Sequence, residues 1–519
     1  MLALPDTFNA AEWFVDRNVA EGRGAKVAIE CGDQCITYAQ LLEQVNRAGN
    51  VLRERFDVRV EERVALILLD GPEFIYSFFG AMKIGAVPVP LSTLWKSHEY
   101  EYALNDSRAR VLIVSDSLRP QIDAIPRERL RYLRHVVVAG EAAPKGPTLQ
   151  QLMSGASSEL EAESTSKDDP AFWLYSSGST GSPKGCVHLH HDMVVCTEHY
   201  AKGILEMSSA DRCFSVAKLF FAYGLGNAMY CPFGVGATTI LWPGPPTASN
   251  VYAVIEKHLP TLFFSVPTNY GMLLAHTREG RDFDLASIRY AVSAGESLPA
   301  ALFERFRQRF GVEILDGIGS TEVLHIFISN RPGAIRPGSS GRIVAGYDAR
   351  IVDEENRDVA DGEIGNLLIR GDSTCAAYWN KHEKTKSTIE GHWIRTGDKY
   401  RRDADGFYWY AGRSDDMLKV GGIWVSPVEV ENTLIEHAAV LECGVGARAD
   451  HDGLLKPYAF VVLRPGFAGT PELAAELQEF ARSKLADYKR PRWVDFIAEL
   501  PKTATGKLQR YKLRERAAT

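Results

Sequence analysis

Hydrophobic and polar residues follow two different periods along the first part of the chain. Between residues 26 and 140, short runs rich in Val, Ile and Leu, such as 64–69 and 111–115, are separated by segments with helical spacing. One of these segments begins near Thr37 and another covers residues 72–84. Because strands that alternate with helices are typical of βαβ units, the pattern predicts a parallel sheet covered by helices.

The same alternation returns between residues 251 and 311. It predicts strands at 261–265 and 288–293, followed by a helix that is capped by Ser297 and closed by Gly311. A second helix-covered region is therefore expected in the middle of the chain.

After about Ser339 the chain changes to short alternating strands joined by Asp-Gly turns at 361–362 and 405–406. This pattern predicts a small antiparallel β subdomain. Further on lies an αβ-like tail with a helix over about 471–487, and we place a domain boundary near Asp415.

Composition narrows the classes of protein. The chain has 519 residues, of which 45% are hydrophobic and 24% charged, so it is long enough for a large multi-part globular domain plus at least one more. A net charge of -7 without a dominant basic patch argues against nucleic acid as a partner. The eight cysteines are scattered through apolar segments, which favours a reduced cytoplasmic setting.

The sequence also argues against a membrane partner. The longest uncharged run, residues 219–255, is interrupted by glycines and prolines, which exclude a spanning helix. The N-terminus lacks the basic start and apolar core of a signal peptide, so none is expected.

Residues 175–185 read Tyr-Ser-Ser-Gly-Ser-Thr-Gly-Ser-Pro-Lys-Gly and have the composition of a phosphate-binding loop. Glycines let backbone N–H groups face an anion, hydroxyls donate further hydrogen bonds, and Lys184 supplies positive charge over the β- and γ-phosphates. The spacing is not that of a Walker loop, and a flexible Ser/Gly-rich turn is the alternative. Strands predicted on both sides, at 171–175 and 185–189, favour a phosphate loop.

Three further segments fit nucleotide chemistry. In residues 316–322 small residues permit close approach to a nucleotide, Thr321 can donate to a phosphate and Glu322 can hold Mg²⁺. The aspartate that ends residues 393–398 can accept both ribose hydroxyls, and residues 501–507 form a rigid turn that presents one lysine. Each segment alone could be a surface turn, but their combination predicts a nucleotide site.

Five motifs, in this order, resemble those of the acyl-adenylate-forming (ANL) superfamily, which comprises acyl-CoA ligases, luciferases and adenylation domains. They cover residues 175–185, 317–322, 396–398, 412–422 and 505–507. Within the superfamily, residues 217–227 and 316–327 look like the benzoate-CoA ligase branch, which also includes hydroxybenzoate and aminobenzoate ligases.

The resemblance implies an α/β fold with two domains. A large N-terminal domain, residues 1–414, is expected to contain two helix-covered sheets and a small β-barrel-like subdomain. Residues 415–519 are expected to form a small mobile α+β domain with Asp415 as its hinge. In the family this domain swings after adenylation, which withdraws one lysine and brings a different face to the site.

The resemblance also implies roles for individual residues. The implied catalytic residues are Lys507, Glu322, Thr321 and Lys419, with Glu322 as the Mg²⁺ ligand and Lys419 acting in the thioester-forming state. The implied ATP- and AMP-binding residues are Ser176, Ser177, Gly178, Ser179, Thr180, Gly181, Lys184, Gly295, Glu296, Asp316, Gly317, Ile318, Thr321, Asp398 and Arg413. The implied CoA path consists of Gly421, Gly422 and Trp424.

The acyl pocket indicates the class of acid. Between residues 214 and 230 the only charged residue is Lys218, so no acidic side chain there can bind the ammonium group of an amino acid. Aromatic residues beside small ones suit a flat ring. For His325, a buried core histidine without a substrate role is the alternative. The residues that match the pocket of benzoate-type ligases are Phe221, Ala222, Tyr223, Ala294, Gly319, His325 and Ile326.

One residue departs from the superfamily pattern. Ile318 stands where most members carry an aromatic residue that stacks on adenine, although the benzoate branch shares this departure. We expect Ile318 to contact the base by apolar packing alone.

The sequence therefore predicts an ATP- and Mg²⁺-dependent aryl-CoA ligase. It would convert a small aromatic carboxylic acid, ATP and coenzyme A, through aryl-AMP, to aryl-CoA, AMP and pyrophosphate. Benzoate and 2-aminobenzoate are the expected acids. An enzyme that loads a carrier-protein thiol, and a nucleotide sensor on a retired ligase fold, are the alternatives, and the sequence leaves open whether the protein is a homodimer.

Overall fold

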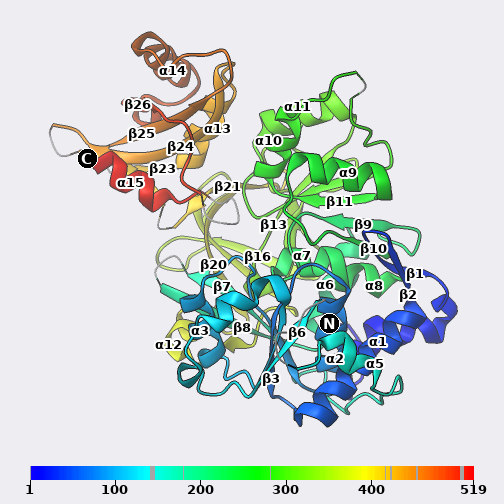
Figure 1. The fold of residues 1–519 in the computed structure, drawn as a ribbon. Coiled ribbons are helices and arrows are strands. Elements are labelled where there is room, and N and C mark those ends of the chain that lie inside the picture. The colour runs from blue at the N-terminus through cyan, green and yellow to red at the C-terminus, as the bar shows by residue number, and fades with distance from the viewer. Residues whose placement is uncertain are drawn as a thin grey trace.

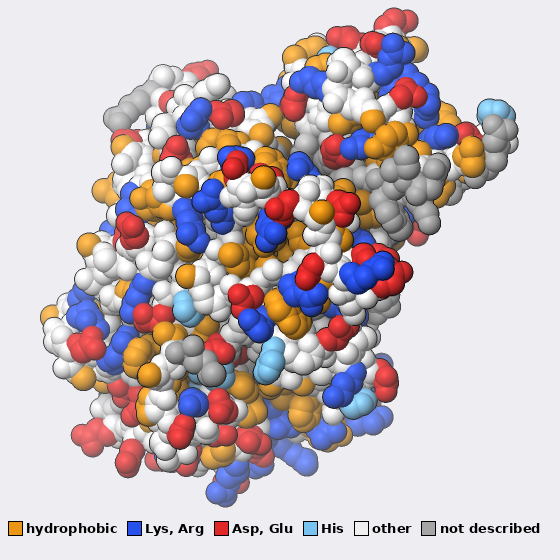
Figure 2. Space-filling view, turned by 180° about the vertical axis from the view of Figure 1, so that it is seen from behind, with side chains coloured by type: hydrophobic (Ala, Val, Ile, Leu, Met, Phe, Trp, Pro, Cys, Tyr) orange, Lys and Arg blue, Asp and Glu red, His pale blue; other side chains and the backbone are white. Residues whose placement is uncertain are grey.

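The computed structural model describes residues 2–140, 146–178, 181–280, 282–414, 416–420, 423–451, 454–502 and 508–518. Most of the chain forms a large body, and the elements from β24 onward lie together at one side of it (Figure 1). Acidic and basic side chains are interspersed over the face seen in Figure 2.

The largest sheet has nine strands in the order β15-β14-β13-β12-β11-β9-β10-β1-β2. In this order, the strands from β13 across to β1 pair in parallel. The pairs β1–β2, β13–β14 and β14–β15, at the two edges of the sheet, are antiparallel. The strands are β1 (Val27–Cys31), β2 (Gln34–Thr37), β9 (Arg212–Ser215), β10 (Thr238–Leu241), β11 (Leu262–Ser265), β12 (Tyr290–Ser293), β13 (Ile314–Gly319), β14 (Ile326–Ser329) and β15 (Arg342–Ile343).

A second, four-stranded sheet has the order β4-β3-β5-β6, and all its neighbours are parallel. Its strands are β3 (Arg63–Ile67), β4 (Val87–Pro90), β5 (Val111–Ser115) and β6 (His135–Ala139). β5 is buried along its whole length, as expected for a strand in a parallel sheet that is covered on both faces. The predicted helix-covered parallel sheets are confirmed.

Two helices test the predicted boundaries. α1 (Tyr38–Asn50) starts at a capping box, in which the Thr37 side chain accepts a hydrogen bond from Gln40 N–H. α11 (Ala300–Phe310) ends at Gly311 as predicted, but its N-cap is Pro299, so the predicted cap at Ser297 is wrong. The residue before a proline is pushed out of the helical region, which delays the start of the helix.

The remaining helices of the large body cover the sheets or join their strands. They include α2 (Pro72–Lys83), α3 (Ser97–Asp106), α5 (Leu149–Ser154), α6 (Asp192–Cys196), α7 (Ala222–Leu225), α8 (Cys231–Val235), α9 (Ala248–His258), α10 (Pro267–Ala275) and α12 (His382–Thr388).

The two strands predicted on either side of the glycine-rich residues 175–185 form a hairpin. β7 (Pro170–Gly178) and β8 (Gly181–Leu189) pair antiparallel, and β18 (Ala377–Tyr378) adds a third strand to β8. We call the pair of strands β7 and β8 the glycine hairpin.

The predicted antiparallel β subdomain is a five-stranded sheet. It contains β16 (Tyr347–Val352), β17 (Gly365–Gly371), β19 (Ile389–Glu390), β20 (Trp393–Arg402) and β21 (Tyr408–Arg413). Gly362 and Gly406 have φ angles of 90° and 82°, so both predicted turns use the left-handed conformation that glycine adopts at little cost.

The C-terminal elements have a core of their own. They include the hairpin of β22 (Leu418–Val420) and β23 (Ile423–Val425), the sheet of β24 (Val440–Ala449), β25 (Leu455–Leu463) and β26 (Trp493–Phe496), and the helices α13 (Pro427–Ile435), α14 (Pro471–Lys484) and α15 (Arg510–Ala518). The predicted boundary at Asp415 lies outside the described residues.

All eight cysteines are free thiols. Within the described ranges, the helices are too short or too polar to cross a bilayer.

Close packing of α1 on α2 depends on Gly49 and Gly80. A Cβ atom at Gly80 would lie 2.8 Å from the Gly49 backbone nitrogen and 2.9 Å from the Val45 carbonyl oxygen. We expect Gly80→Ala to lower the free energy of unfolding by about 1–3 kcal/mol because neither backbone can yield. Denaturant titration measures this loss.

Gly271→Ala is the matched control. A Cβ atom at Gly271, in α10, meets no atom within 4 Å, so alanine should be neutral or raise stability by up to about 1 kcal/mol. An equal loss of stability in the two variants would contradict the close-packing account.

Candidate active site

The glycine hairpin meets the turn that carries Glu322. β8 places Lys184 opposite Ser176 of β7, and the Ser176 hydroxyl donates a hydrogen bond to Glu322 Oε1 at 3.3 Å. Glu322 belongs to a short 3-10 turn, Thr321–Val323, that follows β13. The structure thus brings Ser176, Lys184, Thr321 and Glu322 together from two separate motifs.

Tyr378 completes this group. Its hydroxyl donates to Glu322 Oε1 at 2.7 Å, and the Lys184 ammonium lies 4.5 Å from the centre of its ring. Sequence reasoning missed Tyr378 because it lies 56 residues from Glu322 and no glycine or charge marks its position. Its position on β18, which pairs with β8, is visible only in the structure.

The electrostatics of Lys184 suit an anion site. Burial lowers the pKa of Lys184 from its ordinary value, and the negative charge of Glu322 opposes this shift. A partly desolvated ammonium interacts more strongly with phosphate than one in bulk water.

Asp398 and Arg413 lie side by side on β20 and β21. Arg413 Nη1 donates to Asp398 Oδ1 at 3.1 Å. Gly397, with φ 77°, makes room for the arginine, because a Cβ atom there would lie 3.0 Å from Arg413 Nη2. The two residues expected to bind ribose therefore share one location.

The strand that leads to Glu322 shows why its glycines are needed. A Cβ atom at Gly317 would lie 2.8 Å from the Ile328 carbonyl oxygen, and one at Gly319 would lie 2.5 Å from that of His325. Both glycines permit the antiparallel contact of β13 with β14, a packing role that the sequence analysis did not foresee. In the same strand, Asp316 is buried, and burial raises its pKa well above the ordinary value, while Ile318 packs against the main core.

Gly295 and Glu296 follow the end of β12. Gly295 adopts a left-handed conformation with φ 88°. Glu296 Oε2 accepts a hydrogen bond from the Thr268 hydroxyl at 3.0 Å, which ties this segment to α10.

Tyr223 anchors the expected acyl-binding wall. It lies on α7, and its hydroxyl lies within hydrogen-bond distance of the carbonyl oxygens of Val292, at 3.2 Å, and Ser265, at 3.3 Å. Phe221 stands just before this helix, its ring 4.3 Å from that of Phe220. The smaller expected pocket residues Ala222, Ala294 and Ile326 are buried in the same core cluster.

His325 lies among aromatic rings in this wall. Its ring centre is 6.0 Å from that of Tyr223, and its Nε2 is 3.1 Å from Asn227 Oδ1. Its Nδ1 has no hydrogen-bond partner among the described residues. Burial lowers the pKa of His325 to about 3, so the ring is neutral at physiological pH.

Other expected site residues are described only in part or not at all. The backbone alone is described for Ser177, Gly178, Gly181, Lys419 and Trp424, and the β22–β23 hairpin pairs Lys419 with Trp424. Residues outside the described ranges are Ser179, Thr180, Asp415, Gly421, Gly422 and Lys507.

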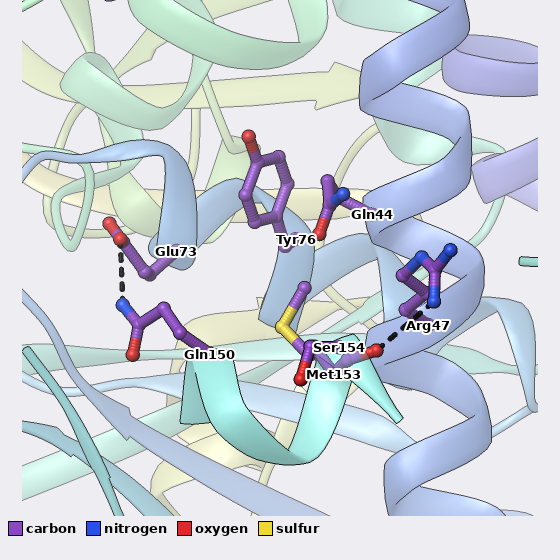
Figure 3. Close-up of a pocket in the computed structure, with 7 residues that line it drawn as sticks. All are labelled: Gln44, Arg47, Glu73, Tyr76, Gln150, Met153 and Ser154. Carbon is purple, nitrogen blue, oxygen red and sulfur yellow. Dashed lines mark hydrogen bonds between the residues drawn. The ribbon is translucent and has the colours of Figure 1, made fainter. Parts of the chain in front are cut away.

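A separate pocket of about 330 Å³ opens between α1, α2 and α5 (Figure 3). Two hydrogen bonds join polar groups of its lining: Gln150 Nε2 donates to Glu73 Oε1 at 2.9 Å, and Arg47 donates to the Met153 carbonyl oxygen at 3.3 Å. None of the expected site residues lines it. We therefore keep the candidate active site at the glycine hairpin.

Comparison with known families identifies this arrangement. Residues 16–379 match the model of the AMP-binding enzyme family, and residues 429–507 match the model of the AMP-binding enzyme C-terminal domain. The chain belongs to the AMP-binding enzyme family. The resemblance to the acyl-adenylate-forming superfamily is thereby confirmed.

Two curated relatives indicate the branch of the AMP-binding enzyme family to which this chain is similar. It is 46% identical to a benzoate–CoA ligase of Thauera aromatica over 99% of this chain and 97% of that protein. It is 47% identical to a 4-hydroxybenzoate–CoA/benzoate–CoA ligase of Rhodopseudomonas palustris, over 98% and 94% of the two chains. The predicted likeness to the benzoate-CoA ligase branch is confirmed.

Solved structures agree with these relatives. An anthranilate CoA ligase in complex with anthranoyl-AMP superposes with a TM-score of 0.94 at 46% identity, over 99% of this chain and 98% of that one. A benzoate CoA ligase from Burkholderia xenovorans LB400 superposes with a TM-score of 0.89 at 45% identity, over 98% and 100%. The predicted α/β fold class, with a large N-terminal domain and a small C-terminal domain, is confirmed.

The buried neutral His325 predicts a pH dependence of stability. Its pKa is about 3 in the folded protein and about 6.5 in an unfolded chain. The unfolded state therefore binds the proton first, and stability is lost as the pH falls below 6.5 towards 3. At pH 5 the loss from this group is about 2 kcal/mol relative to neutral pH.

Denaturant titrations of the wild type and His325→Gln between pH 7 and pH 5 measure this loss. We expect the free energy of unfolding of the variant to fall less steeply between pH 7 and pH 5. The difference in slope should correspond to at most one proton taken up on unfolding, because glutamine does not titrate. His392→Gln, at an exposed position, is the control and should keep the wild-type slope. A wild-type slope in His325→Gln would contradict the assignment.

Proposed function

We propose that the protein is an ATP-dependent arylcarboxylate–CoA ligase. It joins an aromatic acid to AMP and then transfers the aryl group to the thiol of coenzyme A. The observation that carries the proposal is the meeting of Ser176 and Lys184 with Glu322 at the end of the glycine hairpin, in a chain 46% identical to a benzoate–CoA ligase.

The chemistry explains why these charges are needed. A carboxylate is a poor electrophile, so it first attacks the α-phosphorus of ATP in line, while pyrophosphate leaves. Negative charge then crowds the site, and electrostatic stabilisation supplies the largest catalytic contribution. Lys184 would hold the pyrophosphate side, Asp398 and Arg413 the ribose, and Ile318 the base.

The donor set near Glu322 fits magnesium. In the described ranges, no cluster of three or more His, Cys, Asp or Glu side chains could hold a metal ion. Mg²⁺ in nucleotide enzymes needs only one or two carboxylates, because substrate phosphates and water complete its shell. Glu322 would hold the ion, which would neutralise phosphate charge, while Ser176 and Tyr378 orient the carboxylate.

The acyl wall supports an aromatic acid without a strongly basic group. Lys218, the only charged residue between 214 and 230, donates to the carbonyl oxygens of Trp242 and Gly244 and lies 3.9 Å from Asp70. Tyr223 and neutral His325 offer aromatic surface for a ring. The amine of 2-aminobenzoate is weakly basic and can bond to its own carboxylate, so benzoate and 2-aminobenzoate both suit this wall.

The remaining roles follow the family pattern. Lys507 would act in adenylation and Lys419 in thioester formation, with rotation of residues 415–519 about Asp415 between the two steps. Gly421, Gly422 and Trp424 would line the path of the CoA arm. The free thiols, six of them buried, support a reducing cytoplasmic location.

A panel of benzoate and its 2-amino, 2-hydroxy and 4-hydroxy derivatives tests the proposal. The purified protein, with ATP, Mg²⁺ and CoA, should release free aryl-CoA, detected by liquid chromatography and mass spectrometry. We expect kcat/KM for benzoate or 2-aminobenzoate to exceed that of the hydroxybenzoates by at least about tenfold, because a wall made mainly of aromatic and aliphatic side chains offers an added hydroxyl fewer hydrogen bonds than water does.

The same assay separates the alternatives. Acid-dependent ATP–pyrophosphate exchange without aryl-CoA would indicate an enzyme that loads a carrier-protein thiol. Absence of exchange with every acid would overturn adenylation and favour a nucleotide sensor.

A further inference from the structure

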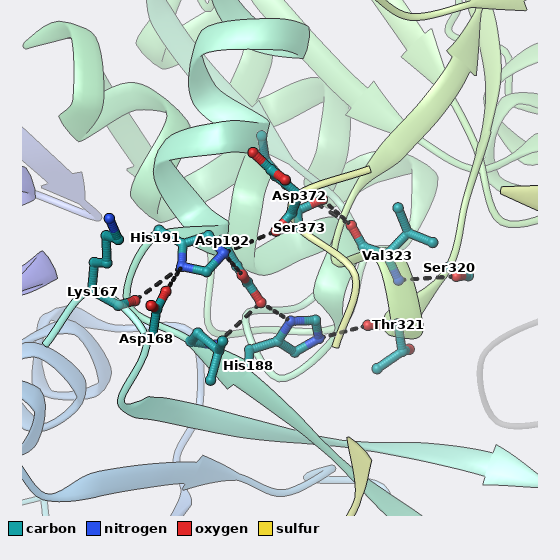
Figure 4. Close-up of polar contacts among 12 residues, drawn as sticks. Lys167, Asp168, His188, His191, Asp192, Ser320, Thr321, Val323, Asp372 and Ser373 are labelled. Carbon is teal, nitrogen blue, oxygen red and sulfur yellow. Dashed lines mark hydrogen bonds and ion pairs between the residues drawn. The ribbon is translucent and has the colours of Figure 1, made fainter. Parts of the chain in front are cut away.

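A buried histidine cluster lies directly behind the Thr321–Val323 turn (Figure 4). His188, near the end of β8, and Asp192, at the start of α6, are both fully inaccessible to solvent. His188 Nε2 lies 2.8 Å from the Thr321 carbonyl oxygen, and its Nδ1 lies 2.7 Å from Asp192 Oδ2. Because a carbonyl oxygen only accepts, Nε2 carries a proton and donates it to the turn.

The orientation of the His188 ring is fixed from three sides. Its face stacks on Phe172, with ring centres 5.2 Å apart and planes at 17°. Asp192 holds Nδ1 and also accepts the Leu189 N–H at 3.1 Å. A carboxylate that fixes an imidazole so that the opposite nitrogen points at its target is a common arrangement behind catalytic and metal sites.

His191 balances the buried carboxylate. Its Nε2 lies 3.2 Å from Asp192 Oδ1, and its two ring nitrogens also face the carbonyl oxygens of Lys167 and Asp372, each at 3.0 Å. Burial works against protonation of this ring, but the Asp192 carboxylate and the two carbonyl oxygens together raise the pKa of His191 above its ordinary value. Asp192 therefore lies between two imidazole rings, with Oδ1 near His191 and Oδ2 orienting His188.

The turn itself is held at each of its three carbonyl oxygens. His188 binds that of Thr321, the Cys375 N–H donates to that of Glu322 at 2.7 Å, and the Ser373 hydroxyl donates to that of Val323 at 2.8 Å. These bonds fix the backbone that presents the Thr321 hydroxyl and the Glu322 carboxylate. The His188 bond is the one that comes from the strand of the glycine hairpin.

Strand geometry links this bond to the phosphate loop. Side chains two residues apart in a strand lie on one face, so Lys184, Cys186 and His188 share a face of β8. Lys184 meets the Tyr378 ring, Cys186 Sγ lies 3.7 Å from Ser176 Oγ, and His188 meets Thr321. One face of β8 therefore carries both the lysine for pyrophosphate and the bond that fixes the turn beside it.

We propose that His188, oriented by Asp192, is a positioning residue for adenylation that sets Thr321 and Glu322 in register with Lys184. This inference rests on the proposed function. His188 does not touch the reacting atoms, and its effect passes through the Thr321 carbonyl oxygen. Loss of the bond should disturb the placement of the nucleotide and the metal ion. It should therefore slow adenylation more than thioester formation.

Two amide substitutions separate the two bonds of His188. The side-chain nitrogen of glutamine reaches about as far as Nε2, so His188→Gln keeps a donor for Thr321. Asparagine reaches only as far as Nδ1, so His188→Asn keeps a donor for Asp192 and loses the bond to the turn. His190→Asn is the control, because His190 is equally buried but accepts from Ala10 N–H at 3.0 Å, away from the turn.

The experiment compares two half-reactions in the full-length protein. ATP–pyrophosphate exchange reports adenylation, and conversion of supplied benzoyl-AMP and CoA reports thioester formation. In His188→Asn we expect adenylation to fall about 10–100-fold, thioester formation to change less than about threefold, and His188→Gln to restore most of the exchange. The ratio of the two rates does not depend on the folded fraction, so it remains informative if a variant is less stable.

Binding provides a readout that does not require turnover. Calorimetric titration gives the factor by which Mg²⁺ raises the affinity for ATP. We expect this factor to be about tenfold smaller in His188→Asn than in the wild type, and unchanged in His188→Gln and His190→Asn. The proposal would be overturned if His188→Asn and His188→Gln had the same ratio of adenylation rate to thioester-formation rate. It would also be overturned if His190→Asn changed this ratio as much as His188→Asn does. Failure of the wild type to catalyse exchange would instead overturn the proposed function, and the binding comparison would still test His188.

Discussion

The candidate site depends on one side chain, Tyr378, that contacts two opposite charges at once. Its hydroxyl binds Glu322 Oε1 at 2.7 Å and its ring lies under the Lys184 ammonium at 4.5 Å. A lysine and a glutamate that paired only with each other would have little charge left for a substrate. Because Tyr378 contacts both groups, the roles proposed for them are compatible: Lys184 would meet pyrophosphate and Glu322 would meet a metal ion in the same small volume.

The surrounding fold serves this arrangement by fixing backbone. The β7–β8 hairpin gains a third strand in β18, which places Tyr378 beside the hairpin, and β13 leads directly into the Glu322 turn. Gly317 and Gly319 are needed because β14 presses against β13 at distances that exclude a Cβ atom. Electrostatic catalysis requires such preorganisation, since dipoles and charges that must move during the reaction stabilise the transition state less.

Local features were predictable from the sequence, and long-range contacts were not. The start of a helix near Thr37, the hairpin strands and the Asp-Gly turns depend on neighbouring residues, and the structure has all of them. The predicted cap at Ser297 was wrong because Pro299 delays the helix. Tyr378 and His188 carried no local signal, since each acts on the 321–323 turn across 56 and 133 residues. Family resemblance indicated which motifs belong to the site, but the contacts that hold them required the structure.

Isotope transfer tests the central claim, that this site activates a carboxylate by attack on the α-phosphorus. With benzoate or 2-aminobenzoate labelled with ¹⁸O in the carboxylate, the attacking oxygen becomes the bridge of aryl-AMP and leaves with AMP when the thiol attacks the carbonyl carbon. Mass spectrometry of the products should therefore find one ¹⁸O atom in AMP and none in pyrophosphate. Label in inorganic phosphate, with ADP as the nucleotide product, would show attack on the γ-phosphorus and contradict the account.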